Sequence, residues 1–159
     1  MIAFLRQSSP ALPRVLAVAS GGGHWVQLKR LLPAFDGCDL TVATVPREER
    51  DPVPCTRQVD IPDATRWDRL GLIKLALRVL ILVISERPRV VISTGAAPGY
   101  FALRFGKWIG ARTIWVDSIA NQERMSMSGE RVRRFADLWL TQWPHLARPD
   151  GPRWLGDVV

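Results

Sequence analysis

Residues 15–24 read VLAVASGGGH and join an apolar segment to three consecutive glycines. The apolar, β-branched part predicts a buried strand, and the glycines mark its abrupt end. Residues 25–32 then carry large apolar side chains three or four positions apart, namely Trp25, Leu28, Leu31 and Leu32. This spacing predicts a helix with one apolar face. A strand, a glycine loop and a helix in this order are typical of a parallel α/β sheet.

The glycine loop predicts a site for an anionic ligand. Glycines let the backbone approach a ligand closely, and the following helix directs its free N–H groups and positive dipole end toward it. We therefore expect Ser20, Gly21, Gly22 and Gly23 to bind a phosphate group, with His24 as a candidate proton acceptor. The spacing matches neither the P-loop nor the G-x-G-x-x-G fingerprint. A tight turn that binds nothing, with His24 capping the helix, is the alternative.

The composition predicts one globular domain with a basic surface. Of the 159 residues, 47% are hydrophobic, and the 22 Lys and Arg residues exceed the 15 Asp and Glu residues, for a net charge of +7. We expect a leader over residues 1–13 and a single domain over residues 14–159. The charge favours an anionic partner, either nucleic acid or an acidic membrane surface. Nucleic acid is not expected, because no recognised nucleic-acid motif is present and the tryptophans are dispersed as core residues are.

The cysteines and the apolar segments predict the compartment. Cys38 and Cys55 have no metal-ligand spacing, which indicates free thiols in a reducing environment. The first residues lack the long apolar stretch of a signal peptide, and no apolar run approaches the roughly 20 residues of a spanning helix. We therefore expect a protein of the cytoplasm.

The remaining elements extend the α/β pattern. Further strands are predicted near residues 40–45, 58–61, 89–93, 112–116 and 137–142, with helices at 66–85, 100–109 and 130–135. Alternating strands and helices predict a doubly wound, Rossmann-like parallel sheet, whose ligands bind beyond the carboxyl ends of the strands. At that edge we expect three loops to converge: the first loop (residues 20–24), the second loop (93–99) and the third loop (117–121).

The long helix at 66–85, with Thr65 as its expected N-cap, is apolar around most of its circumference. Such a helix is either buried between the sheet and a neighbouring element, or it places a second face in a membrane interface. In the second case its cations reach lipid phosphates. The residues that we assign to a membrane contact are Arg66, Arg69, Lys74, Arg78 and Leu82.

Three segments together resemble one protein family. They are ASGGGH at residues 19–24, VISTGAAPG at 91–99, and DS at 117–118 followed by ADLWLTQWP at 136–144. They resemble the accessory, membrane-recruiting subunits of split GT-B glycosyltransferases, over about residues 14 to 157. One such subunit serves the enzyme that adds the second N-acetylglucosamine to dolichyl diphosphate. The resemblance is closer to PssD-type accessory subunits of bacterial exopolysaccharide β-1,4-glucuronosyltransferases.

The resemblance implies a fold like the N-terminal half of a GT-B glycosyltransferase, which holds a lipid-linked acceptor. It implies a catalytic partner chain that carries the UDP-sugar, and a polyprenyl-diphosphate-linked saccharide as acceptor. Peripheral attachment to the cytoplasmic face of the inner membrane would follow, with glucuronosyl transfer during exopolysaccharide assembly. Two alternatives are a binding and anchoring module without catalytic groups and a stand-alone nucleotide-binding enzyme.

The resemblance also implies roles for individual residues. His24 is the candidate base and Asp117 its rival, although Asp117 could equally close an Asx turn at the end of its strand. The other acceptor-binding candidates are Ser20, Gly21, Gly22, Gly23, Thr94, Gly95, Ala96, Pro98, Gly99, Ser118 and Asn121. The expected partner contacts are Gln142, Trp143 and Pro144.

The implied chemistry requires a base for the acceptor hydroxyl and positive charge near the leaving diphosphate. His24 and His145 stand apart in the sequence, with no acidic pair at metal-ligand spacing. We therefore expect a metal-independent mechanism and no cofactor.

Overall fold

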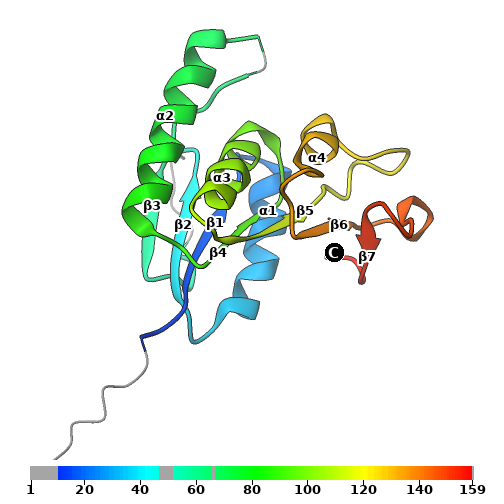
Figure 1. The fold of residues 1–159 in the computed structure, drawn as a ribbon, viewed down its shortest axis with the longest axis horizontal. Coiled ribbons are helices and arrows are strands. Elements are labelled where there is room, and N and C mark those ends of the chain that lie inside the picture. The colour runs from blue at the N-terminus through cyan, green and yellow to red at the C-terminus, as the bar shows by residue number, and fades with distance from the viewer. Residues whose placement is uncertain (1–10, 47–51, 66, 159) are drawn as a thin grey trace, which may run out of the picture.

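The computed structural model describes residues 11–46, 52–65 and 67–158. Within this part the chain forms a seven-stranded sheet in the order β3-β2-β1-β4-β5-β6-β7, in which every pairing is parallel (Figure 1). The strands are β1 (Arg14–Val18), β2 (Asp39–Thr44), β3 (Arg57–Asp60), β4 (Val90–Ser93), β5 (Arg112–Val116), β6 (Leu138–Thr141) and β7 (Arg153–Trp154). The predicted doubly wound fold is confirmed.

The strand order reverses at the middle of the sheet. From β1 the chain proceeds outward through β2 to β3, and it then returns to place β4 on the other side of β1. The register pairs Val18 with Ser93, so β1 and β4 end side by side. A crevice at such a reversal point is where open α/β sheets bind their ligands. The first and second loops leave the sheet at this point.

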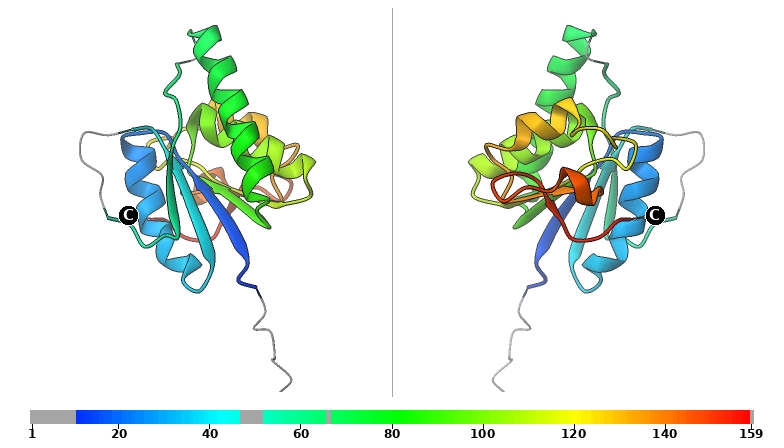
Figure 2. Two further views of the ribbon diagram at one scale, coloured as in Figure 1. Left: turned by 90° about the vertical axis from the view of Figure 1, so that its left-hand side faces the viewer. Right: turned by 90° about the vertical axis from the view of Figure 1, so that its right-hand side faces the viewer.

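Helices cover the two faces of the sheet unequally. Figure 2 shows α1 (Gly23–Leu31) on one face and α2 (Arg69–Glu86), α3 (Ala96–Trp108) and α4 (Met127–Val132) on the other. Two short 3₁₀ helices, η1 (Leu32–Phe35) and η2 (Pro144–Leu146), complete the fold. Each face has its own apolar core. Trp25 and Leu28 of α1 belong to the core on one face, and Leu103 and Trp115 belong to the larger core beneath the other three helices.

Three helices begin at other residues than the sequence predicts. Asp68 rather than Thr65 caps α2, because its carboxylate accepts a hydrogen bond from the Gly71 N–H at 2.8 Å. The helix predicted from residue 100 begins at Ala96, since a proline in the first turn is tolerated there. The helix predicted at 130–135 corresponds to α4, which begins earlier, at Met127, with Ser126 as its N-cap. Strand β7 is not predicted by the sequence pattern.

Helix α2 is neither fully buried nor simply amphipathic. One face packs in the core through Leu75, Val79, Leu82 and Val83. The opposite face exposes a stripe of large apolar side chains, here named the α2 stripe: Leu70, Ile73, Leu77, Ile81 and Ile84. The prediction that Leu82 contacts a membrane is wrong, because Leu82 is only 3% exposed. Arg69, Lys74 and Arg78 are exposed, and their contact with a membrane stays a prediction. Arg66 lies outside the described residues, as do residues 1–10 of the predicted leader.

Among the helices of the described residues, none combines the length and apolar character that a membrane span requires.

Candidate functional site

The first loop is open where it faces away from the protein. Gly22 has φ +64°, a left-handed conformation that favours glycine. Gly21 and Gly23 have ordinary backbone conformations, and a Cβ atom added to either would meet nothing within 4 Å. The protein's own packing therefore does not require glycine at these two positions. Bare backbone at the start of α1 is the feature that a closely approaching ligand would use.

His24 does not cap α1. The N-cap position of the helix is Gly22, no side chain caps it, and the His24 ring reaches to the second loop. Its Nδ1 lies 2.9 Å from the Thr94 carbonyl oxygen, and the Thr94 hydroxyl donates to the His24 carbonyl oxygen at 2.7 Å. A carbonyl oxygen only accepts, so Nδ1 carries the proton and Nε2 is left as the acceptor. Nε2 has no hydrogen-bond partner among the described residues.

The second loop is shaped to receive the His24 ring. A Cβ atom on Gly95 would lie 2.4 Å from His24 Nδ1, and Gly95 has φ +143°. Ala96 follows with φ +62°, which is unusual for a residue with a side chain. Helix α3 begins here without a side-chain cap, as α1 does. Strained backbone at the reversal point of the sheet is characteristic of ligand-binding loops.

Two predicted residues of the second loop serve packing. Pro98 and Gly99 are buried. A Cβ atom on Gly99 would lie 1.9 Å from the Ser93 hydroxyl oxygen, which accepts a hydrogen bond from the Gly95 N–H at 3.1 Å. Glycine at this position thus lets α3 approach β4 closely and leaves room for the Ser93 hydroxyl, which holds the Gly95 N–H.

Asp117 organises the third loop. Its side chain is buried, with 1% exposure, and its carboxylate accepts four hydrogen bonds. The donors are Trp115 Nε1, Asn121 Nδ2, and the Ser126 amide and hydroxyl, the last two at 2.7 and 2.5 Å. A buried carboxylate engaged in this way is a structural group. The geometry therefore favours a structural role for Asp117 over its role as a base, although its backbone donor is Ser126 and not the nearby amide of an Asx turn.

The other predicted residues of the third loop make local contacts. Asn121 donates to Asp117 at 3.3 Å, and the Ser118 hydroxyl accepts from the Ala120 N–H at the same distance. Both side chains are half-buried. These contacts shape the loop, and they leave Ser118 and Asn121 at its surface.

Gln27 joins helix α1 to the third loop and is not predicted by the sequence pattern. From the buried face of α1, its Nε2 donates to the Asp117 carbonyl oxygen at 3.0 Å. Its Oε1 accepts from the Ile119 N–H at 3.4 Å. A glutamine 4% exposed among Trp25 and Leu28 must have buried partners. Its place on the apolar face of the helix is the signal that identifies it.

The predicted partner contacts differ in exposure. Gln142 is 3% exposed, so the expectation that it lies on a partner surface is wrong. It donates to the Asp117 carbonyl oxygen at 2.9 Å and accepts from the Val158 N–H at 2.7 Å, tying the chain's last described residues to the third loop. Trp143 donates to the Ile119 carbonyl oxygen at 2.9 Å and is half-buried, and Pro144 is exposed.

The described residues contain no group of three or more His, Cys, Asp or Glu side chains that could hold a metal ion.

Comparison with curated proteins finds similarity to one kind of subunit. The chain is 39% identical over 72 residues to the UDP-N-acetylglucosamine transferase subunit ALG14 of Yarrowia lipolytica, a match that covers 42% of this chain and 33% of the relative. It is 43% identical over 49 residues to ALG14 of Eremothecium gossypii, covering 30% of this chain and 22% of the relative. The matched segments thus span a third or less of either relative's length. No protein-family profile matches the chain.

Comparison with solved structures shows the fold. The structure matches MurG of Acinetobacter baumannii with a TM-score of 0.67 at 12% identity, over 89% of this chain and 45% of that one. It matches UDP-N-acetylglucosamine 2-epimerase of Rickettsia bellii with a TM-score of 0.64 at 10% identity, over 84% of this chain and 40% of the other. Over part of its length the chain is therefore similar to ALG14 subunits, and its fold is the Rossmann-like fold seen in the N-terminal half of MurG, a GT-B glycosyltransferase.

Proposed function

We propose that this chain is the acceptor-binding subunit of a two-chain glycosyltransferase, with the nucleotide sugar held by a catalytic partner chain. The observation that supports this most is the junction of the first and second loops. There His24 is fixed by Thr94 with its Nε2 free, between two helix N-termini that carry no side-chain caps. The similarity to ALG14 subunits supports the assignment to a transferase subunit.

The loops offer a site for the acceptor's diphosphate. Helices α1 and α3 start at neighbouring strands, and each leaves N–H groups and a positive dipole end at the reversal point of the sheet. Gly21 and Gly23 present bare backbone there. Ser20 and Thr94 add hydroxyl groups, although that of Thr94 is engaged with His24. We expect the lipid diphosphate of a polyprenyl-linked saccharide to bind at these loops.

His24 is the proposed base. In the transfer step its Nε2 takes the proton of the acceptor hydroxyl while that oxygen bonds to the anomeric carbon of the sugar. The bond from this carbon to the nucleoside diphosphate breaks, and the diphosphate leaves with the electron pair. The Thr94 carbonyl oxygen holds the Nδ1 proton and stabilises the imidazolium that forms. The reaction as proposed needs no metal.

The α2 stripe supports attachment to a membrane. Its five apolar side chains are each more than half exposed, and Trp67 beside them is 80% exposed. Isolated apolar residues are ordinary on a protein surface, but a contiguous row marks an interaction site. Arg69, Lys74 and Arg78 on the same helix are exposed cations. An apolar face combined with basic charge is the pair of signals that peripheral binding to acidic lipids requires. We place this surface on the cytoplasmic face of the inner membrane.

The transferred sugar is a separate part of the proposal. The similar subunits are named as subunits of a UDP-N-acetylglucosamine transferase, which favours this donor. The motif resemblance to exopolysaccharide systems favours glucuronosyl transfer instead. Both UDP-N-acetylglucosamine and UDP-glucuronic acid are therefore donors to be tried with the assembled pair.

A binding module without catalytic groups is the second candidate function. The engagement of Asp117 favours it, because one of the two candidate bases is thereby occupied in the fold. In this version the partner supplies the base, and only the acceptor and membrane sites belong to this chain.

Ligand binding by the isolated chain tests the proposal. Calorimetric titration in detergent should show binding of undecaprenyl diphosphate, and Gly21→Val should weaken it because the side chain fills the open space above the loop. UDP-sugars should bind weakly or not at all. Tight binding of a UDP-sugar without binding of the lipid would instead support a stand-alone nucleotide-binding enzyme.

A further inference from the structure

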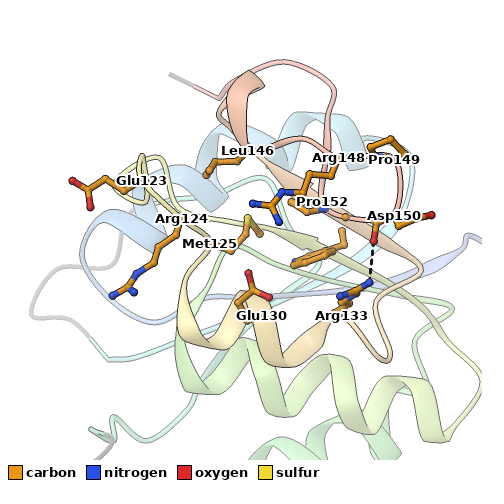
Figure 3. A pocket seen from close by; sticks show the side chains of 12 residues that line it. Glu123, Arg124, Met125, Glu130, Arg133, Leu146, Arg148, Pro149, Asp150 and Pro152 are labelled. Atoms are coloured by element: carbon orange, nitrogen blue, oxygen red, sulfur yellow. Dashed lines mark hydrogen bonds between the residues drawn. The ribbon is translucent and has the colours of Figure 1, made fainter.

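A second hollow lies apart from the three loops described above. It has a volume of about 350 Å³, within the range of small-molecule sites. Its walls come from residues 123–125, from α4, from β6 and from the turn at 148–152. None of the residues predicted to bind acceptor, membrane or partner lines it. Figure 3 shows its side chains, and we name it the Trp139 pocket.

Four buried side chains form the apolar floor of the Trp139 pocket, and one of them also carries a hydrogen-bond donor without a partner. Met125, Trp139, Leu146 and Pro152 line it and are buried. The Trp139 indole is 9% exposed, and its Nε1 has no hydrogen-bond partner. Within the described part of the chain it is the sole buried side-chain nitrogen or oxygen in this condition. A buried donor without an acceptor costs about 1–3 kcal/mol, so a ligand acceptor that reaches it is favoured.

The rim carries charges of both signs in equal number. Glu123, Glu130 and Asp150 stand against Arg124, Arg133 and Arg148, and all six are exposed. None of these side chains forms an ion pair with another described residue, and only Arg133 makes a hydrogen bond, to the Asp150 carbonyl oxygen at 3.1 Å. Figure 3 shows Arg148 and Glu130 pointing into the pocket, whereas Glu123 and Arg124 point away from it. The inward-facing pair thus offers a donor and an acceptor with unused capacity.

Two backbone hydrogen bonds close the turn that carries Arg148. The Arg148 N–H donates to the Pro152 carbonyl oxygen, and the Gly151 N–H donates to the Arg148 carbonyl oxygen, each at 3.1 Å. The Arg148 side chain also lies against Gly151, where an added Cβ atom would be 2.9 Å from the Arg148 Cβ. The stem of Arg148 is therefore held at the mouth of the pocket, while its guanidinium group can change rotamer to admit a ligand.

We infer that the Trp139 pocket binds a saccharide unit of the glycan substrate. Each sugar hydroxyl both donates and accepts hydrogen bonds, so it suits a pocket that offers both a carboxylate and a guanidinium group, as the inward-pointing Glu130 and Arg148 do. The C–H face of the ring suits the apolar floor, and one ring hydroxyl can accept from the indole N–H. This inference rests on the proposed function for the kind of ligand, but the site is separate from the proposed catalytic loops.

Other ligand classes fit the pocket less well. A phosphate group would meet the inward-pointing Glu130 carboxylate, and an apolar ligand would leave Glu130 and Arg148 without partners. A small zwitterion such as an amino acid also matches a rim of mixed charge. It lacks the C–H face and the row of hydroxyls, and it is the alternative that the experiment separates from a sugar.

The test uses the full chain and N,N′-diacetylchitobiose as the probe. In ¹H–¹⁵N spectra, the Trp139 indole signal is identified as the one missing from Trp139→Phe. We expect this signal to shift saturably as the disaccharide is added. The indole signal of Trp108, an exposed residue of α3, should stay in place. Glu130→Gln should weaken binding about tenfold, because a hydrogen bond to a charged acceptor is lost while the exposed rim position leaves the fold unaffected.

The outcomes separate this inference from the proposed function. His24→Ala should abolish transfer in the assembled enzyme and leave the Trp139 shift unchanged. Saturable binding without any transfer would contradict the proposed function only. Glycine, glucuronic acid and galactose are titrated in the same way as chitobiose. The inference would be overturned if the Trp139 signal shifts with glycine but with none of the sugars, or if no ligand shifts it. Binding that is the same in Glu130→Gln and Arg148→Gln as in the unaltered chain would overturn it as well.

Discussion

His24 and Thr94 hold each other by two hydrogen bonds that run in opposite directions. The imidazole Nδ1 donates to the Thr94 carbonyl oxygen at 2.9 Å, and the Thr94 hydroxyl donates to the His24 carbonyl oxygen at 2.7 Å. The residues are 70 positions apart and lie at the ends of neighbouring strands β1 and β4. Together they fix the tautomer of the ring and the spacing of the two loops.

Replacing His24 tests its role as a base. His24→Ala should lower kcat of the assembled enzyme by about 10²- to 10⁴-fold, the usual contribution of a general base, with little change in KM for the acceptor. His145→Ala is the matched control, because His145 is exposed and its ring contacts the Gln122 carbonyl oxygen and the Trp143 ring, outside the first and second loops. Steady-state kinetics with both variants measure the effect. Near-normal turnover of His24→Ala would assign the base to the partner chain.

Two glycine substitutions separate packing from ligand approach. Gly95→Ala places a Cβ atom 2.4 Å from His24 Nδ1 at a backbone φ of +143°, so we expect a loss of about 1–3 kcal/mol in the free energy of unfolding. Gly21→Ala adds a Cβ atom in open space, so its stability should not change. Urea denaturation of both variants measures this difference, and equal stability of the two would contradict the described geometry.

Asp117→Asn tests the structural role of the buried carboxylate. The amide nitrogen of Asn cannot accept a hydrogen bond, so at least one of the two Ser126 contacts is lost. We expect a loss of about 1–3 kcal/mol in the free energy of unfolding. Denaturation monitored by circular dichroism gives the value. Unchanged stability combined with lost turnover would restore Asp117 as a candidate base.

The α2 stripe predicts binding to vesicles. The double variant Leu77→Glu and Ile81→Glu should abolish co-sedimentation with phosphatidylglycerol vesicles while the protein remains folded, because both side chains are exposed. Lys74→Gln and Arg78→Gln should each weaken binding by about 1 kcal/mol. Arg112→Gln removes the same charge at the amino-terminal edge of the sheet and is the control. Equal loss in the control would mean that net charge alone controls binding.

Asp137 makes stability depend on acid pH. Burial tends to raise the pKa of its carboxyl group, but hydrogen bonds from Lys107 and from the Thr113 amide and hydroxyl outweigh burial and lower the pKa. A lowered folded-state pKa contributes stability above the unfolded pKa of about 3.9, and this contribution is lost as the pH falls through the folded value. Asp137→Asn should therefore weaken the fold at neutral pH and reduce the acid-dependent loss of stability. Thermal melts between neutral pH and pH 2 measure both effects.

The sheet and its loops could be predicted from the sequence because their signals are local. Apolar runs that end in glycines locate β1 and β4, and the alternation of strands with helices gives their parallel arrangement. Contacts between distant segments could not be predicted in the same way. The partner of His24 lies 70 residues away and that of Gln27 lies 90 residues away, and no periodicity encodes such pairs.

The orientation of α2 shows a second limit. The helix is apolar on nearly every side, so its sequence does not say which side faces the sheet. Leu82 packs in the core and Ile81 beside it is exposed. Strand β7 has two residues only, which is too short for any alternation to show.

The most direct test of the account is sugar transfer in a reconstituted pair. The chain is purified from membranes with and without the candidate catalytic partner, and labelled UDP-N-acetylglucosamine or UDP-glucuronic acid is supplied with a polyprenyl-diphosphate-linked acceptor. The account predicts that label reaches the lipid only when both chains are present. Transfer by this chain alone, or equal transfer by the partner without it, would contradict the account.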